Sequence, residues 1–288
     1  MKDSPTGAGS RDLLECIEEQ GPWPFVTRRV YLVGEQAEQV WESRRHRKGL
    51  GKVAAGNLGG WLWAPGDLNW WIGSVFAIGS SLFALGSILL LAPSLARAWS
   101  ISAGGINLIY FLGSIPFTCA AYLQLYQSAN APEPPDVVAR RRRSWFGWRP
   151  RDIGWLSCAL QFAGTLFFNL NTLDAMNASL TWFQQDLAVW VPDILGSILF
   201  LASGYLAFVE TCHAHGAWKS RSLAWWITAI NLLGCISFML AANFAIILPG
   251  PAHPEMALLA TAFTLLGALC FLLGSLLMLP ETSIEATP

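Results

Sequence analysis

Charged residues are scarce in this sequence. Asp, Glu, Lys and Arg make up 13% of its 288 residues, whereas hydrophobic residues make up 53%. Soluble domains average about 25% charged residues. The shortage of charge, together with long apolar runs, argues against a soluble protein and favours a chain that crosses a membrane several times.

Paired cysteines are also missing. The six cysteines include no CxxC pair, which argues against a disulfide framework and against a closed zinc site. Four of them lie inside apolar runs, where a thiol packs as a small hydrophobic group. We therefore interpret the cysteines as free packing residues.

Catalytic signatures are absent as well. The chain has no Ser-His-Asp order, no Walker A loop and no GxGxxG pattern after a strand. The segment ETCHAH at 210–215 holds residue types that bind metals, but its alternate histidines do not share a helical face. A solvated loop is favoured there over a metal site. We expect no enzyme, no metal and no cofactor.

We expect no secretory signal before the first apolar run, because positions 1–20 mix acidic side chains with few apolar ones. We expect 1–68 to form a cytoplasmic N-terminal region that is too small and polar to have its own core. Residues 11–19 are predicted to form a short helix. Residues 26–33 and 38–43 are predicted to pair as a hairpin around Gly34. The region could dock under the membrane helices.

Six apolar runs follow, each about as long as a helix needs to cross a bilayer. Because lipid offers no hydrogen bonds to the backbone, such runs form helices, and they do not alternate as barrel strands would. The sequence predicts an all-α membrane protein with six transmembrane helices in a domain at 69–280 and a short cytoplasmic tail at 281–288. The predicted spans are 69–91, 104–125, 153–173, 189–209, 223–248 and 255–279.

The basic residues predict the orientation of these helices. Of the 18 Lys and Arg residues, only Arg97 falls on one side of the predicted membrane, and the others fall on the opposite side. Cytoplasmic loops are enriched in Lys and Arg, so both termini are expected in the cytoplasm. Tryptophans cluster at the predicted helix starts, which is typical of the membrane interface. The plasma membrane is the favoured location.

Each predicted span carries one pattern: a glycine, a small residue, and a phenylalanine four positions after the glycine. The copies run from Gly79 to Phe83, Gly113 to Phe117, Gly164 to Phe168, Gly196 to Phe200, Gly234 to Phe238 and Gly267 to Phe271. The spacing of the glycines is nearly constant within consecutive pairs of spans, whereas it varies between pairs. This internal repeat favours three similar helical hairpins. A three-plus-three inverted repeat is the alternative, and the similar positions of Asn107 and Asn231 in their helices support it.

The pattern is interpreted as a packing motif. Positions i and i+4 share a helix face, so a glycine that admits a neighbouring helix lies beside a phenylalanine that fills the adjacent space. Membrane helices associate through such close packing. The clearest copy lies in SVFAIGSSLFALGS at 74–87, where packing is favoured over a pore-lining role.

Ionisable residues are nearly absent from the predicted spans, which argues against a proton-coupled pump and a voltage sensor. Uncharged polar residues do occur in them. Interhelical hydrogen bonding accounts for these residues, and a polar ligand site is the alternative. The candidate ligand-binding residues are Asn107, Asn231, Gln161 and Asn169.

The connection at 131–152 joins a proline-rich start to a basic and aromatic stretch. We expect this stretch to contact anionic lipid headgroups of the bilayer and to bind no nucleic acid. Its membrane-surface residues are Arg140, Arg141, Arg142, Arg143, Trp145 and Trp148. The sequon at Asn177 is a glycosylation candidate on the expected outer face. The candidate protein partners are a second copy of the chain, in a homo-oligomer, or a membrane partner protein.

The stretch NWWIGSVFAIGSSLFALGS at 69–87, with a short soluble region before it and a second helix after it, resembles the YrhK-like family of small bacterial membrane proteins and their multi-helix relatives. The resemblance covers the first predicted span and extends more loosely to the others through the glycine–phenylalanine pattern. Because that family has no established activity, the resemblance implies a membrane architecture and no catalytic residue.

Two function classes follow. The sequence favours a structural, interaction or stress-related membrane component, because packing motifs abound and buried charge is lacking. The alternative is a channel or facilitative transporter for a small neutral or weakly polar solute. A continuous polar path lined by Asn107, Asn231 and Gln161 would favour transport, and a dry closed bundle would count against it.

Overall fold

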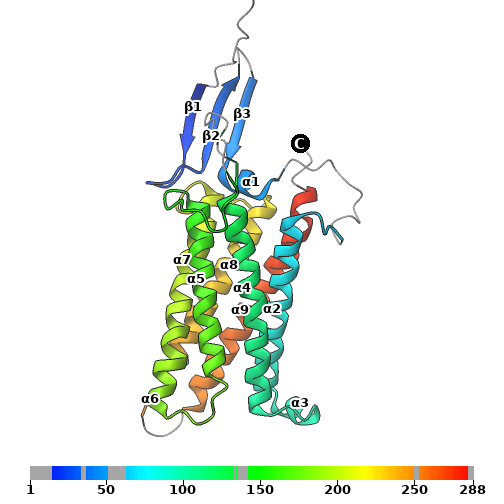
Figure 1. Ribbon diagram of the computed structural model, residues 1–288, viewed down its shortest axis with the longest axis vertical. Helices are drawn as coiled ribbons and strands as arrows, with labels where there is room; N and C mark the ends of the chain where they lie inside the picture. The colour runs from blue at the N-terminus through cyan, green and yellow to red at the C-terminus, as the bar shows by residue number, and fades with distance from the viewer. Residues whose placement is uncertain are drawn as a thin grey trace, which may run out of the picture.

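The computed structural model describes residues 15–33, 37–50, 63–132, 134, 142–249 and 253–284. Six long helices form one bundle, and a small sheet stands at one end of it (Figure 1). All six are long and apolar enough to cross a membrane, so the predicted all-α fold with six spans is confirmed. The spans are α2 (Leu68–Leu91), α4 (Ala103–Ala129), α5 (Ile153–Asp174), α6–η1–α7 (Trp182–Cys212), α8 (Leu223–Phe244) and α9 (Pro254–Ile284).

The fourth span differs most from the prediction, since it begins at Trp182 rather than 189. It consists of α6 (Trp182–Gln185), a π-helical turn η1 (Asp186–Trp190) and α7 (Val191–Cys212). Pro192 has no N–H and crowds the carbonyl four residues earlier, which favours a wider turn there. At the other boundaries, α8 ends at Phe244 rather than the predicted 248, and α9 continues past 279.

Three antiparallel strands form the sheet in the order β1 (Glu15–Gln20), β2 (Arg28–Val33) and β3 (Ala37–Glu42). The predicted hairpin is confirmed by the pairing of β2 with β3. The short helix predicted at 11–19 is wrong for 15–19, and residues 11–14 lie outside the described residues. Glu19 faces Arg29 across the β1–β2 pair at 2.9 Å, and such cross-strand charge pairs favour the strand.

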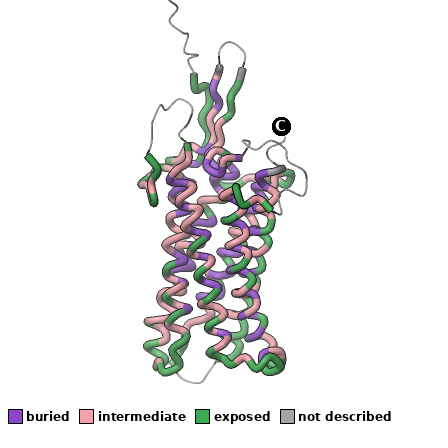
Figure 2. Tube along the Cα trace, turned by 45° about the vertical axis from the view of Figure 1, so that its right-hand side comes forward, coloured by how far each residue is buried: buried purple, intermediate pink, exposed green. Residues whose placement is uncertain are grey.

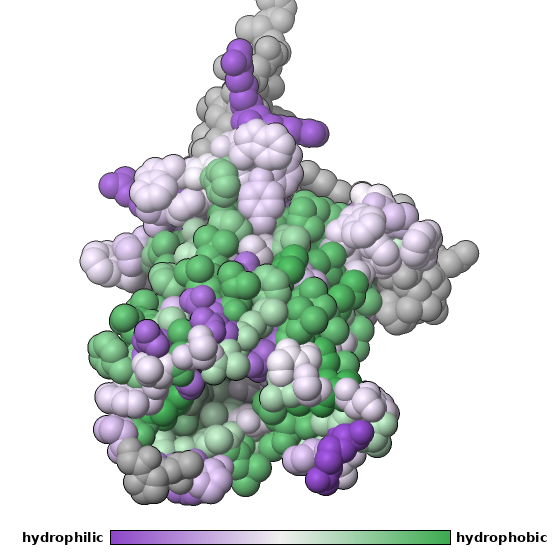
Figure 3. Space-filling model, turned by 60° about the horizontal axis from the view of Figure 1, so that its bottom comes forward, coloured by the Kyte–Doolittle hydropathy of each residue, from purple (hydrophilic) through white to green (hydrophobic). Residues whose placement is uncertain are grey.

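The long helices form a closed ring in which each packs against two neighbours, in the order α2, α4, α5, α7, α8, α9 and back to α2. The short helix α3 (Pro93–Ala98) joins α2 to α4 at the end opposite the sheet. Figure 2 shows buried residues along the inner faces of the helices. The face of the bundle drawn in Figure 3 is mostly hydrophobic. Each of the six helices exposes large apolar side chains, among them Ile78, Leu112, Leu170, Ile198, Leu233 and Leu269. This arrangement suits a ring surrounded by lipid.

The glycine–phenylalanine pattern is buried in every long helix, and its contacts are exchanged within each hairpin. In α5 and α7, the ring of Phe200 packs over Gly164, and Phe168 lies beside Gly196. The same exchange links α2 with α4 and α8 with α9. The small residue after each glycine is also buried: Ser80, Ser114, Thr165, Ser197, Cys235 and Ala268. The pattern therefore packs the interior of the bundle.

Replacing Gly164 by alanine should destabilise the bundle by about 1–3 kcal/mol, the usual range for overpacking. An added Cβ would lie 2.6 Å from the Phe200 ring and 3.1 Å from the Gly196 carbonyl oxygen. The control is Gly104→Ala in α4, where the nearest atom would be 3.9 Å away. Thermal unfolding in detergent measures both, and equal melting temperatures for the two variants would contradict this packing role.

Candidate functional site

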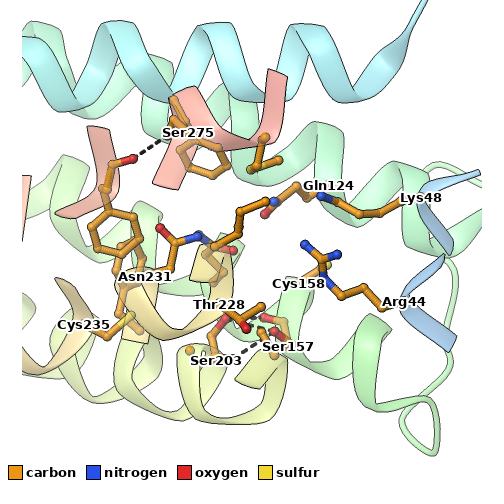
Figure 4. A pocket seen from close by; sticks show the side chains of 18 of the residues that line it. Arg44, Lys48, Gln124, Ser157, Cys158, Ser203, Thr228, Asn231, Cys235 and Ser275 are labelled. Carbon is orange, nitrogen blue, oxygen red and sulfur yellow. Dashed lines mark hydrogen bonds between the residues drawn. The ribbon is translucent and has the colours of Figure 1, made fainter. Parts of the chain in front are cut away.

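A polar cavity lies inside the sheet half of the ring; we term it the inner chamber. Its volume is about 70 Å³, and all six long helices contribute to its wall. Figure 4 shows the amides of Gln124 and Asn231 facing this space, with hydroxyls of Ser157, Ser203 and Thr228 nearby. Because a buried water needs roughly 10–15 Å³ of such volume, the inner chamber has room for a few waters or one small solute.

A second cavity, the outer cavity, lies inside the opposite half of the ring. It measures about 290 Å³ and is also walled by all six spans, with Asn107, Asn171 and Asp193 among its polar residues. Figure 3 looks toward this end and shows a hollow among the helix ends. The two cavities thus lie in line along the axis of the ring.

Phenylalanine side chains separate the two cavities. The six phenylalanines of the repeated pattern are all buried and belong to one cluster, termed here the phenylalanine barrier: Phe83, Phe117, Phe168, Phe200, Phe238 and Phe271. Their ring centroids lie as close as 4.9 Å, between Phe168 and Phe200. A gap of about 10 Å³ lies among them, which is at or below the volume that holds one water.

The barrier is about one side chain thick on each side of this gap. Phe200 lines both the gap and the inner chamber. Phe83, Phe168 and Phe238 line both the gap and the outer cavity. These few rings therefore separate the two cavities.

Helix α1 (Ser43–Lys48) closes the inner chamber at the sheet end. Strand β3 leads directly into it, and Gly49 ends it in the left-handed conformation at φ 68°. Arg44, Arg47 and Lys48 are spaced i, i+3 and i+4 on one helix face, and all three line the chamber. Each of the three is buried.

Two buried carboxylates hold α1 in place. Arg47 Nη2 donates to Glu210 Oε2 of α7 at 2.8 Å, and Ser43 Oγ donates to Glu210 Oε1 at 2.6 Å. Arg44 and Lys48 both donate to Glu281 of α9. Both carboxylates are fully buried. Removing one partner of such an ion pair is costly because a charge is left buried, so these contacts fix the cap on the ring.

Burial and these carboxylate partners shift the pKa values of the basic side chains of α1 in opposite directions. Burial lowers the pKa of Lys48 to about 8, although Glu281 opposes this effect. Burial also disfavours the charged form of Arg47, but Glu210 outweighs it and raises the pKa of Arg47 above its usual value. Both groups are therefore charged near neutral pH, and Lys48 titrates within reach of ordinary buffers.

The structure divides the predicted ligand-binding residues between the two halves of the ring. Gln161 and Asn231 line the inner chamber. Asn107 lines the outer cavity, and its Nδ2 donates to the Ala175 carbonyl at 2.6 Å. Asn169 donates to Thr118 at 2.9 Å and lines neither of these cavities. The polar path is thus interrupted by the phenylalanine barrier.

The predicted surface residues lie in loops. Trp145 and Trp148 are 71% and 79% exposed, and Arg142 and Arg143 precede them in the same loop at the sheet end. Arg140 and Arg141 lie outside the described residues. Asn177 is exposed at the opposite end, where its Oδ1 accepts a hydrogen bond from Ser179 Oγ at 2.7 Å.

Sequence reasoning missed the buried ion pairs. Segment 210–215 is predicted as solvated, but Glu210 lies fully buried in α7. His213 ends that helix and hydrogen-bonds to Thr27 of the N-terminal region. Glu281, assigned by sequence to the tail, lies within α9. The spacing of Arg44, Arg47 and Lys48 on one helical face is the signal in the sequence that could have indicated a buried basic face.

No protein-family model, no curated protein and no solved structure matches this chain.

Proposed function

We propose that this protein is a channel or facilitative transporter for a small solute, with the pathway along the axis of the helix ring. The observation that supports this proposal most directly is the succession of cavities along that axis. The inner chamber, the small gap and the outer cavity share the side chains of the phenylalanine barrier as their common walls. Apolar constrictions of this kind close channels by excluding water.

The repeated pattern supports this proposal in a way that packing alone does not. Each of the six helices contributes the phenylalanine of its repeated pattern to a single cluster inside the ring, while the ring's outer face is apolar. Polar groups lie toward the axis, in both cavities. A bundle that served only as a scaffold has no need of cavities at both ends of its core, so the geometry favours the function that the sequence ranked second.

The proposed orientation places the sheet and α1 in the cytoplasm. Among the residues that the structure describes, Arg97 of α3 is the only Lys or Arg at the end opposite the sheet. Such asymmetry supports a cytoplasmic sheet end. The exposed Trp145 and Trp148 beside Arg142 and Arg143 support contact with anionic headgroups on that side. We propose the plasma membrane as the location.

Flux through proteoliposomes tests the function. Purified protein is reconstituted, and the permeability to urea, glycerol and small monovalent salts is measured by stopped-flow light scattering. Uptake of at least one of these solutes above that of empty liposomes is expected. If neither the natural protein nor the barrier variant described in the Discussion passes any of these solutes faster than empty liposomes, the proposal is wrong.

The second candidate is a structural or interaction component without transport or enzymatic activity. The exchanged glycine–phenylalanine contacts favour it, since they give each hairpin a tightly packed interior. We propose that the chain consists of three pseudo-repeated hairpins and is a multi-helix relative of YrhK-like proteins, on the basis of the sequence pattern. The absence of flux together with a defined membrane partner protein would support this candidate.

A further inference from the structure

The charges around the inner chamber do not cancel. Arg44, Arg47 and Lys48 face two carboxylates, Glu210 and Glu281. Arg47 and Glu210 form one pair. Arg44 and Lys48 share the single carboxylate of Glu281, so this group of described side chains carries one positive charge in excess.

Two further carboxylates lie nearby. Asp152 interacts with Arg47 and also with Arg149, so counting Asp152 together with Arg149 leaves the excess of one positive charge unchanged. Asp152 accepts hydrogen bonds from the backbone N–H groups of Gly154 and Trp155, at 2.9 and 3.1 Å. Asp67 accepts from the backbone N–H of Asn69 at 2.9 Å and from Thr282 at 2.9 Å. Both aspartates cap the positive N-terminal ends of long helices, which compensate their charge. The excess at the chamber is therefore left for a ligand to balance.

The wall of the chamber offers hydrogen bonds as well as charge. Lys48 and Arg44 reach into it from the α1 end, and the amides of Gln124 and Asn231 face it from α4 and α8 (Figure 4). The oxygen of each amide is buried and accepts no hydrogen bond from the described residues. Each amide also carries an NH₂ group, which can donate to a ligand. Since neither carboxylate of the cluster is among the described residues that line the chamber, its wall is cationic and rich in neutral polar groups.

We propose that the inner chamber is a binding site for a small monovalent anion, which deepens the proposed function by naming its substrate class. One negative charge balances the excess, and the buried cations interact with it strongly because water is largely excluded. A volume of about 70 Å³ suits an ion of the size of chloride, nitrate or formate. A divalent anion overcompensates the charge, and a larger organic anion exceeds the space.

Binding is tested on the purified full chain in detergent, separately from transport. Thermal unfolding is followed in sodium nitrate, sodium sulfate and sodium gluconate at equal ionic strength. Saturable stabilisation by nitrate, well above that by sulfate or gluconate, is expected. Equal effects of the three salts would overturn the proposal. Nitrate binding without anion flux in liposomes would support the site and contradict only the transport function.

Lys48→Met is the decisive variant. It removes the excess charge and leaves Arg44 paired with Glu281, so the nitrate dissociation constant should rise at least about tenfold. Arg45→Met is the matched control, because Arg45 lies on the same helix, is exposed and does not line the chamber. If Lys48→Met does not fold, Asn231→Leu keeps every charge and should still weaken nitrate binding. Unchanged affinity in the variant that folds would overturn the proposal.

The pH dependence provides a second readout on the natural protein. The groups facing Lys48 are Arg44 and Arg47 on α1, Glu281 on α9 and the thiol of Cys158 on α5. Burial lowers the pKa of Lys48 to about 8, so the ammonium is mostly protonated at pH 7 and mostly neutral at pH 9.5. Nitrate affinity should therefore fall as pH rises through 8, while Lys48→Met should show no such fall. A natural protein with constant affinity between pH 7 and 9.5 would contradict the role of Lys48.

Discussion

Replacing Phe200 and Phe238 together by serine should raise flux through the ring at least about tenfold, because lowering a barrier by only ~1.4 kcal/mol gives this factor. Phe200 separates the gap from the inner chamber, and Phe238 separates the gap from the outer cavity. Their ring centroids are 6.5 Å apart. Serine in both positions joins the three spaces and gives water polar partners. The charged and polar groups of the α1 cap can hydrogen-bond to water and solutes, whereas the phenylalanine rings cannot. The apolar barrier is therefore expected to limit passage.

The matched control is Phe263→Ser. Phe263 stacks on Phe244 with centroids 5.8 Å apart and lines none of the three spaces on the axis. The Phe263→Ser variant makes the same chemical change outside the pathway. Flux through this variant should therefore equal flux through the natural protein. Phe200→Leu with Phe238→Leu provides a second control, since it keeps the barrier apolar.

Cys235 offers an independent measure of water access. It lines the inner chamber and is buried in the natural protein. In a background with the five other cysteines, Cys16, Cys119, Cys158, Cys212 and Cys270, changed to serine, a water-soluble thiol reagent should modify Cys235 faster when Phe200 and Phe238 are also serine. If the double serine variant folds and neither its flux nor the reactivity of Cys235 rises, the phenylalanine cluster is not the barrier. Should it fail to fold, the double variant Phe200→Ala with Phe238→Ala, which also shortens both side chains of the barrier, provides the same comparison.

Glu281→Gln should destabilise the protein by about 3–5 kcal/mol, the usual cost of breaking a buried ion pair from one side. Glu281 is fully buried and is shared by Arg44 and Lys48. Its loss leaves two cations facing each other at the end of the ring. For a chain of this size, the melting temperature should fall by roughly 10 °C, as measured by thermal unfolding in detergent.

Two comparisons separate this effect from a general loss of charge. Glu19→Gln removes a partner of Arg29 from a half-exposed pair on the sheet and should cost at most about 1 kcal/mol. The triple variant Arg44→Met, Lys48→Met, Glu281→Leu removes Glu281 together with both of its cationic partners and keeps the Arg47–Glu210 pair. It should recover most of the stability, because no unpaired charge remains. If Glu281→Gln melts like Glu19→Gln, the cluster does not hold the cap.

Much of the fold follows from local patterns in the sequence. The apolar runs predict six spans because a helix must stay apolar over its whole length to cross lipid, and all but the fourth begin at or next to the predicted start. The glycine–phenylalanine pattern predicts close packing, and the structure places each of these phenylalanines in one buried cluster. Both features depend on neighbours a few positions away in the chain.

The cap and the chamber depend on partners far apart in the chain. Arg47 pairs with Glu210 across 163 residues, and Arg44 pairs with Glu281 across 237. In the sequence these residues are charges near the ends of apolar runs, where solvation is the ordinary expectation. Only the ring topology brings α1, α7 and α9 together. Gln161 and Asn231 likewise line one chamber only because the ring brings α5 and α8 to the same interior. Their separation along the sequence does not predict this.

The ion pairs between α1 and α9 also determine when α1 can take its final position during synthesis of the chain. The basic face of α1 is synthesised long before Glu210 and Glu281, so its three cations lack these carboxylate partners until the last helix has been made. The last turn of the sixth helix then supplies the carboxylate that Arg44 and Lys48 share. Closure of the ring and seating of α1 thus become a single late step, which a nascent chain completes only when all six helices are in place.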